Sequence, residues 1–286
     1  MQNIKLFIEL TRLNRPIGYM LLFWPCLWGL AIAYDFKSDL NMFYFYFFLF
    51  LMGSILMRSA GCIVNDIVDK NFDKKVERTK NRPIASGTVS VNLGIIYSIS
   101  LCGIAFLVLI NFNKFTILMA LLSMPLAFTY PLMKRFTYWP QLFLGITFNY
   151  GLILGWTAIN GEIELVPILF YIGAIFWTLG YDTIYGYQDI KDDEIIGLKS
   201  TSIKFKGNAK KFLLLCYSFV LIFFMMGGSY MNFHFSYYLL SIVPFLHLLF
   251  YQIKVFDLNN SISCLKAFKS NNLFGFIIFI NILITK

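Results

Sequence analysis

Charged side chains are scarce in this chain: they make up 14% of its 286 residues, against about 25% in a typical soluble domain. Hydrophobic residues make up 58%, aromatic residues make up 19%, and the mean hydropathy is +0.69. A chain with so little charge does not fold as an ordinary water-soluble domain. The composition therefore indicates an integral membrane protein.

Cysteine and histidine motifs are also missing. The five cysteines are scattered as single residues and form no C-x-x-C pair, and the two histidines, His234 and His247, stand thirteen residues apart. These spacings indicate neither a zinc site nor a disulfide framework. We also expect no cleavable signal peptide, because charged residues interrupt the N-terminus and no A-x-A-type site follows the first apolar run.

Nine apolar stretches approach the length of about 20 residues that a helical membrane span needs. They cover residues 16–34, 42–64, 89–110, 115–131, 141–159, 165–187, 212–230, 236–253 and 270–285. The last is short and Pro125 interrupts the fourth, so the sequence fits eight or nine spans. We expect one polytopic membrane domain over residues 1–286, an all-α bundle of about nine transmembrane helices around a central cavity.

The basic residues set the expected orientation. If the N-terminus is cytoplasmic, 20 of the 24 Lys and Arg residues fall in inside segments and 3 fall in outside segments, while Arg58 lies within the second span. This asymmetry is what the positive-inside rule requires. The net charge of +9 then reflects membrane topology, and we expect no nucleic-acid partner.

Acidic residues number only 15, and seven of them gather in two short runs that each follow an apolar stretch on the predicted cytoplasmic side. Carboxylates at a membrane boundary are costly unless an opposite charge offsets them. The first run contains Asn65, Asp66, Asp69 and Asp73, and the second contains Asp182, Tyr185, Asp189, Asp192 and Asp193.

The spacing within each run predicts that its polar groups converge. Asn65, Asp69 and Asp73 recur every fourth residue, and residues 182, 185, 189 and 193 also share one face of a continuous helix. Two such faces brought together place several carboxylates around one cavity. Mg²⁺ offsets their repulsion and takes its remaining oxygen ligands from a substrate phosphate. The alternative is that the aspartates only pair with nearby Lys and Arg at a headgroup-level surface.

Basic residues near these runs are candidates for binding phosphate. Arg78 and Arg82 follow the first run and Lys199 follows the second, although cytoplasmic loops are also basic because they face anionic lipid. Arg58 lies inside an apolar run, two turns before Asn65, and a charge in such a place indicates a functional site. Lys134 and Arg135 follow the fourth span as topology signals or anion ligands.

Two signatures give the chain a family resemblance. The pattern N-D-x-x-D-x-x-x-D at 65–73, with R-x-K-N-R-P at 78–83, resembles the first signature of the UbiA prenyltransferase superfamily. The pattern D-x-x-Y-x-x-x-D-x-x-x-D at 182–193 resembles the second. Residues 12–18, 58–62 and 129–135 resemble the 4-hydroxybenzoate polyprenyltransferase branch in particular.

This resemblance implies a nine-helix fold with a cytoplasmic Mg²⁺ site in a bacterial inner membrane. It implies that the protein transfers an all-trans polyprenyl group from polyprenyl diphosphate to the ring of 4-hydroxybenzoate, ortho to the hydroxyl, in ubiquinone biosynthesis. The predicted metal ligands are Asn65, Asp66, Asp69, Asp73, Asp182, Asp189 and Asp193, with Asp69, Asp73, Asp189 and Asp193 catalytic. The predicted substrate-binding residues are Asn65, Arg58, Arg78, Arg82, Lys134, Arg135, Tyr185 and Lys199.

Two alternatives to this function stay open. One is a related enzyme with another acceptor (haem, a naphthoate or a chlorophyllide), and the other is a transporter with an acidic site. The acidic runs favour no acceptor, because they bind only the shared diphosphate. A transporter fits less well, since its site would lie near the membrane midplane and both runs lie at one face. The sequence sets neither the prenyl chain length nor an oligomeric state.

Overall fold

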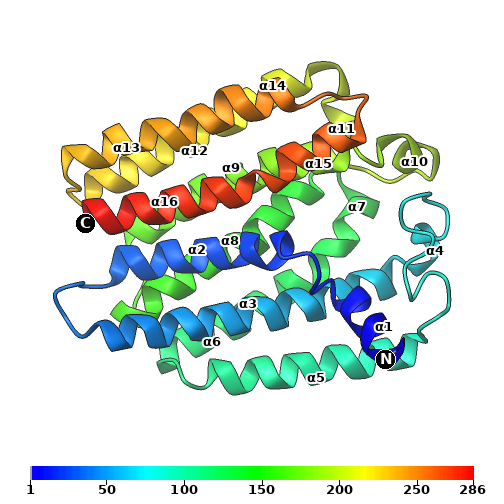
Figure 1. Cartoon of the computed structure of the whole chain (residues 1–286), viewed down its shortest axis with the longest axis horizontal. Helices are drawn as coiled ribbons and strands as arrows, with labels where there is room; N and C mark the ends of the chain where they lie inside the picture. The colour runs from blue at the N-terminus through cyan, green and yellow to red at the C-terminus, as the bar shows by residue number, and fades with distance from the viewer. Residues whose placement is uncertain (1) are drawn as a thin grey trace.

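The computed structural model describes residues 2–286, and every regular element in that range is a helix (Figure 1). The long apolar elements are α2 (Ile17–Ala33), α3 (Leu40–Val68), α5 (Val91–Leu109), α6 (Lys114–Thr129), α8 (Pro140–Asn160), α9 (Leu165–Gly186), α12 (Ala209–Tyr230), α13 (Phe235–Leu246) with its continuation η3 (His247–Gln252) and α14 (Ile253–Val255), and α16 (Asn271–Thr285). The shorter elements are α1 (Gln2–Thr11), α4 (Lys70–Asp73), η1 (Tyr130–Leu132), α7 (Met133–Phe136), α10 (Ile190–Ile195), α11 (Thr201–Lys204), η2 (Lys206–Asn208) and α15 (Ser261–Lys269).

The nine predicted spans each coincide with one of these long elements. Within the described chain, eight helical segments are long and apolar enough to cross a bilayer, and α2, with 17 residues, is a shorter apolar helix. Pro125 does not end α6, which continues to Thr129. Membrane helices tolerate an internal proline where nearby groups bond the freed backbone.

The shorter helices outside the nine spans were not predicted. One of them, α15, occupies residues 261–269 just before the last span and packs against α9. The side chain of Asn260 begins this helix by accepting hydrogen bonds from the backbone N–H groups of Ile262 and Ser263, at 3.0 and 3.1 Å. Such a cap satisfies donors that the first helical turn leaves free, and it stabilises a segment of low hydrophobicity.

The centre of the bundle is the contact between α2 and α8, and glycine makes it close. A Cβ atom on Gly29 would overlap the carbonyl oxygen of Leu152, and one on Gly155 would lie 2.6 Å from the backbone nitrogen of Leu30. Small residues let membrane helices approach at backbone distance, where dispersion contacts are most numerous. Gly29 and Gly155 thus allow the backbones of α2 and α8 to meet directly.

Aromatic side chains fill the core beside this contact. The Trp28 ring of α2 lies 5.1 Å from the Trp177 ring of α9 and 5.6 Å from the Phe224 ring of α12, measured between centroids, and all three side chains are fully buried. Asn271, at the start of α16, accepts a hydrogen bond from the Trp177 indole at 2.7 Å. The core therefore joins α2, α9, α12 and α16 into one packed unit.

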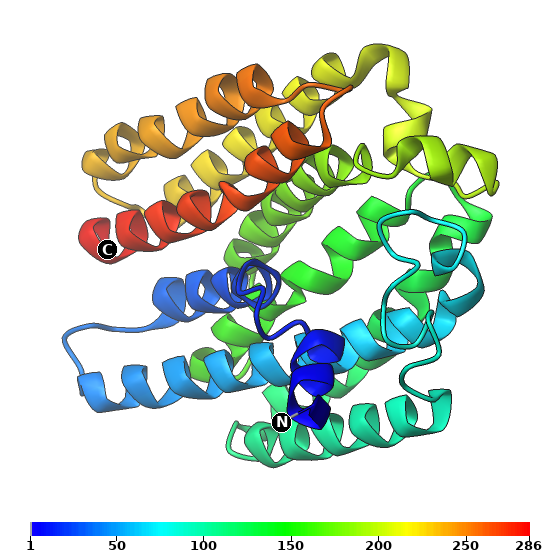
Figure 2. The same ribbon diagram turned by 45° about the vertical axis from the view of Figure 1, so that its right-hand side comes forward.

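Both acidic runs lie at the same end of the bundle. Figures 1 and 2 place α4, α7 and α10 at this end, while the α2–α3 connection and the C-terminus lie at the opposite end. Segments that are more than 100 residues apart in sequence therefore meet, since Arg78 bonds Asp189 across a separation of 111 residues. The orientation of this end toward the cytoplasm stays a prediction.

Candidate functional site

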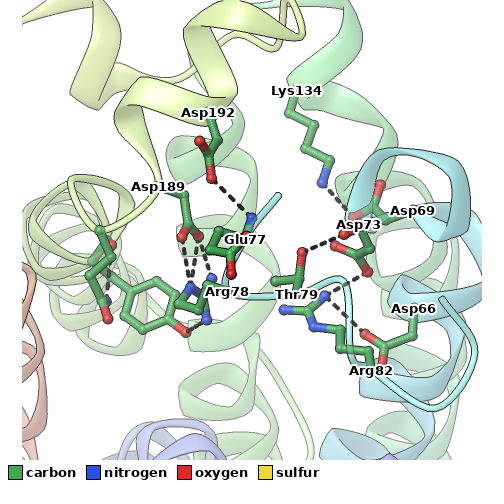
Figure 3. A network of polar contacts seen from close by, with 12 residues as sticks. Asp66, Asp69, Asp73, Glu77, Arg78, Thr79, Arg82, Lys134, Asp189 and Asp192 are labelled. Carbon is green, nitrogen blue, oxygen red and sulfur yellow. Dashed lines mark hydrogen bonds and ion pairs between the residues drawn. The ribbon is translucent and has the colours of Figure 1, made fainter. Parts of the chain in front are cut away.

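A small polar cavity of about 120 Å³ lies between the two acidic runs. It brings together eight of the residues that the sequence predicted. They are Asn65, Asp69, Asp73, Arg78, Arg82, Lys134, Asp189 and Asp193. Side chains of both signs thus face one another across the cavity (Figure 3).

The first run keeps its predicted alignment although the helix is interrupted. Asp69 separates α3 from α4, with φ −93° and ψ 4°. Backbone hydrogen bonds nevertheless keep helical spacing, because the N–H of Asp69 donates to Asn65 at 2.9 Å and that of Asp73 donates to Asp69 at 2.8 Å. The three side chains therefore stay on one side and line the cavity.

The second run does not form the continuous helix that its spacing suggested. The α9 helix ends at Gly186, and the N–H groups of residues 187–189 bond carbonyls only three residues back, at 3.2–3.3 Å. The cause is tertiary: the Ser202 hydroxyl donates to the carbonyl of Thr183 at 2.7 Å, which is the carbonyl that the N–H of Tyr187 would need. Only Asp189 and Asp193 reach the cavity as a result.

Basic side chains pair with the aspartates of the first run. Asp69 is 1% exposed, accepts a hydrogen bond from the Lys134 ammonium, and lies 3.6 Å from the Arg135 guanidinium. Arg82 lies 2.8 Å from Asp73. Each of these carboxylates is buried, and such groups need an opposite charge close by. The cavity wall is therefore a network of alternating charges.

The loop after α4 extends this network to the second run. The Arg78 guanidinium donates to both carboxylate oxygens of Asp189, from Nε to Oδ1 at 2.7 Å and from Nη2 to Oδ2, and from Nη1 to the Tyr185 hydroxyl at 3.1 Å. The backbone N–H of Glu77 donates to Asp192 at 3.1 Å. Since the same loop carries Arg82, it ties both runs to one another (Figure 3).

Asp193 is a cavity carboxylate with a strongly raised pKa. Burial and, next, the negative charge of Asp189 raise the pKa of Asp193 to about 7. In the described part of the chain no basic side chain forms an ion pair with it. A carboxylate in this situation gains most from a cation that enters the cavity.

The remaining predicted site residues do not line the cavity. They are Asp66, Asp182, Arg58, Arg135, Tyr185 and Lys199. Tyr185 contacts Arg78, and Arg135 contacts Asp69, so both adjoin residues that line the cavity. The Lys199 ammonium donates to the carbonyl of Phe136 at 3.3 Å.

Arg58 lies deeper in the membrane-spanning part of α3. Its guanidinium stacks on the Phe148 ring at 5.4 Å, and its buried Nε atom has no hydrogen-bond partner among the described residues. A buried N–H without a partner is uncommon in native structures and calls for an explanation.

The sequence did not predict a place for Arg12 beside the site, although it lies in the family-like segment 12–18. Arg12 donates a hydrogen bond to Asp66, which is 54 residues away. Sequence reasoning also missed Thr79, which lines the cavity and donates from its hydroxyl to the carbonyl of Asp73 at 3.1 Å. Neither contact follows from the spacing of residues along the sequence. For Arg12, the available signal was the resemblance of residues 12–18 to a family segment.

The donor set suits a hard cation together with an oxyanion. Within residues 2–286 no three His, Cys, Asp or Glu side chains converge closely enough to hold a metal ion, and Lys and Arg side chains pair with three of the cavity carboxylates. The cavity still presents four carboxylates and one amide, which are oxygen ligands that Mg²⁺ prefers, beside three cations that suit phosphate. The fold and cavity thus define a helical membrane protein that binds a small, multiply charged ligand at one end.

The UbiA prenyltransferase family profile matches residues 22–281. The chain therefore belongs to the UbiA prenyltransferase family. The mitochondrial 4-hydroxybenzoate polyprenyltransferase of Drosophila pseudoobscura pseudoobscura is 41% identical over 283 residues, which cover 98% of this chain and 70% of that protein. The 4-hydroxybenzoate geranyltransferase 1 of Lithospermum erythrorhizon is 41% identical over 291 residues, covering 99% and 91%.

Solved structures agree on the fold. A UbiA homolog from Aeropyrum pernix K1, without ligand, superposes with a TM-score of 0.78 at 23% identity and covers 93% of this chain and 97% of that chain. A UbiA homolog from Archaeoglobus fulgidus, bound to DMAPP and Mg²⁺, has a TM-score of 0.68 at 17% identity and covers 95% and 98%. The all-helical bundle predicted from the sequence is confirmed.

Proposed function

We propose that this protein transfers an all-trans polyprenyl group from polyprenyl diphosphate to the aromatic ring of 4-hydroxybenzoate, ortho to the hydroxyl, and releases diphosphate. The observation that carries the proposal is the cavity in which Asp69, Asp73, Asp189 and Asp193 face Arg78, Arg82 and Lys134. Relatives with about 40% identity that are named for this reaction support the choice of acceptor. The reaction belongs to ubiquinone biosynthesis.

The proposal includes Mg²⁺, which Asn65, Asp69, Asp73, Asp189 and Asp193 would hold. When bound, the ion neutralises the diphosphate and makes it a better leaving group. Arg78, Arg82 and Lys134 donate hydrogen bonds to aspartates in the present structure. In the reaction the same donors stabilise the charge that develops on the departing diphosphate.

The protein also keeps water from the reacting carbon. Breaking the allylic C–O bond leaves a cation or a loose ion pair, which water would convert to an alcohol. Asp69 and Asp73 are 1% and 6% exposed, and Phe72, Val76 and Leu198 complete the lining with apolar surface. The reaction requires that the ring carbon of the acceptor meets the allylic carbon away from bulk solvent, and the burial of these two aspartates supports such a site.

We propose that Arg58 binds the carboxylate of 4-hydroxybenzoate. The sequence left three candidates, but Lys134 and Arg135 are already engaged with Asp69. Arg58 forms no ion pair with a described carboxylate, and this separates it from Arg135, since the buried Nε atoms of both arginines lack a hydrogen-bond partner among the described residues. An acceptor anion that enters the membrane-spanning part of the protein needs a cation there.

Substitution of Arg58 by methionine should raise KM for 4-hydroxybenzoate by about 10- to 100-fold, the loss expected when one charged hydrogen bond is removed. KM for polyprenyl diphosphate should stay unchanged, and so should KM for the uncharged analogue 4-hydroxybenzamide. Lys134→Met is the matched comparison. It should raise KM for polyprenyl diphosphate and leave KM for 4-hydroxybenzoate unchanged. Equal effects of both substitutions on both substrates would overturn the assignment.

Product analysis tests the proposed reaction directly. Purified protein in lipid nanodiscs is incubated with all-trans polyprenyl diphosphate and, in turn, 4-hydroxybenzoate, a hydroxynaphthoate, haem and a chlorophyllide. We expect a prenylated product from 4-hydroxybenzoate alone, identified by mass, and its loss when EDTA removes divalent ions and return when Mg²⁺ is added. A product from another acceptor, or uptake of solute by proteoliposomes without any product, would replace the proposal.

We also propose that residues 1–286 form one membrane domain with the N-terminus and the cavity on the cytoplasmic side. The distribution of 20 basic residues to inside segments and 3 to outside segments supports this orientation. A bacterial inner membrane is the proposed location. Several relatives carry mitochondrial names, so they support a membrane location without favouring the bacterial one.

A further inference from the structure

A row of alternating charges connects the N-terminal segment to the cavity. The Arg12 guanidinium donates to the Oδ1 atom of Asp66, and the Nη1 atom of Arg82 lies 3.1 Å from the same oxygen. The same Nη1 atom donates to Asp73 at 2.8 Å. Arg82 and Asp73 line the cavity, whereas Arg12 and Asp66 do not. Figure 3 shows Arg82 placed between the two carboxylates.

Asp66 is therefore placed differently from the other acidic residues of its run. The residue is 2% exposed, and both of its cationic partners are arginines. A buried carboxylate needs its counter-charge, and removing one partner leaves the other more strongly bound. Without Arg12, Arg82 would be the sole counter-ion of Asp66 and would be drawn away from Asp73.

The backbone at Arg12 points to a role for its side chain. Arg12 has a φ of 57°, in the left-handed region that is unfavourable for every residue except glycine. It follows directly after α1, where Leu10 and Thr11 are buried against the bundle. Glycine would make this corner without strain, whereas arginine adds a guanidinium that reaches Asp66. Strained conformations of this kind persist where neighbouring interactions hold them.

We propose that Arg12 and Asp66 are positioning residues, which together hold the Arg82 guanidinium beside Asp73 and within reach of the substrate diphosphate. Asp66 is then a counter-charge and not a metal ligand. The inference rests on the proposed function, because it assigns Arg82 to the diphosphate of that reaction. If so, the segment after α1 that carries Arg12 supports the site without contacting the substrate.

The substitution Arg12→Gly separates this role from a purely structural one, because glycine fits the backbone and removes only the side chain. We expect the variant to unfold near the wild-type temperature, yet to raise KM for polyprenyl diphosphate by about 10- to 100-fold, as is usual when a supporting residue is lost. KM for 4-hydroxybenzoate should not change, and Arg12→Lys should recover part of the loss. The matched control is Asn232→Gly, at the other positive-φ residue (φ 53°), which should change nothing.

A double substitution tests the charge argument. Removing the charge of Asp66 in the Arg12→Gly background removes the group that draws Arg82 away, so Arg12→Gly/Asp66→Asn should be no less active than Arg12→Gly alone. Losses that multiply would mean that the two residues act independently and would overturn the inference. So would wild-type kinetics for Arg12→Gly.

A binding measurement keeps this inference separate from the proposed reaction. Calorimetry with Mg²⁺ and inorganic diphosphate requires no acceptor and no turnover. If Arg12→Gly weakens this binding by about the same 10- to 100-fold, the inference holds even if 4-hydroxybenzoate proves to be the wrong acceptor. If the wild type prenylates 4-hydroxybenzoate and Arg12→Gly binds diphosphate normally, the inference fails and the proposed function stands.

Discussion

Asp189→Asn should lower turnover by about 10²- to 10³-fold, the usual effect of removing one group that stabilises developing charge. The substitution keeps the size of the side chain but removes the negative charge that would hold the metal ion and that binds Arg78 here. Asp69, Asp73 and Asp193 line the same cavity, so their asparagine variants should behave alike. Initial rates of prenyl transfer, measured on equal amounts of folded protein, provide the test.

Glu194→Gln is the matched control for this series. Glu194 lies one residue from Asp193 on α10, but it is exposed, pairs with Lys206 at 2.8 Å and does not line the cavity. Its loss should leave turnover within about twofold, because exposed ion pairs contribute little. Near-normal turnover in more than one of the four asparagine variants would contradict the two-run metal site.

Gly155→Ala should lower the stability of the protein strongly for a change that adds a single methyl group. Its Cβ atom would overlap the carbonyl oxygen of Cys26 and lie 2.6 Å from the nitrogen of Leu30, and both belong to the backbone of α2. Rotation of a side chain cannot relieve such a contact, so α2 and α8 must separate. We expect a cost at or above the upper end of the about 1–3 kcal/mol seen for overpacked cores. The midpoint of thermal unfolding in detergent measures it.

Gly53→Ala and Gly103→Ala are the controls for this prediction. Both glycines lie inside membrane helices, α3 and α5, and a Cβ atom on either would meet nothing within 4 Å. They should be neutral or stabilise by about 0.5–1 kcal/mol, because alanine is the better helix former. If Gly155→Ala unfolds at the same temperature as these controls, the α2–α8 contact does not hold the bundle together.

The arrangement of spans was predictable because membrane helices must satisfy their backbone internally and match the thickness of the bilayer. That constraint acts on each stretch separately, so the nine predicted ranges coincide with nine helical elements. The α15 helix was not predicted, because spans were recognised as long apolar stretches and residues Ser261–Lys269 are too polar to form one. Its stability comes from the Asn260 cap and from packing against α9.

The site was only partly predictable, because spacing along a helix indicates a face only while the helix continues. The first run kept its alignment through Asp69, but the Ser202 hydroxyl bonds a carbonyl of the last turn of α9 and turns the second run at residue 187. Asp182 therefore stays away from the cavity. The basic partners of the aspartates could not be predicted from spacing either. The Arg12–Asp66 and Arg78–Asp189 pairs join residues that are 54 and 111 positions apart in the sequence.

The central claim is that the cavity between the two acidic runs binds diphosphate through a divalent ion. Calorimetry of inorganic diphosphate binding to the purified protein, with Mg²⁺ and then with EDTA, tests it most directly. We predict saturable binding that requires Mg²⁺ and is lost in Asp189→Asn but kept in Glu194→Gln. Binding of equal strength with and without the ion, or unchanged in Asp189→Asn, would contradict the account.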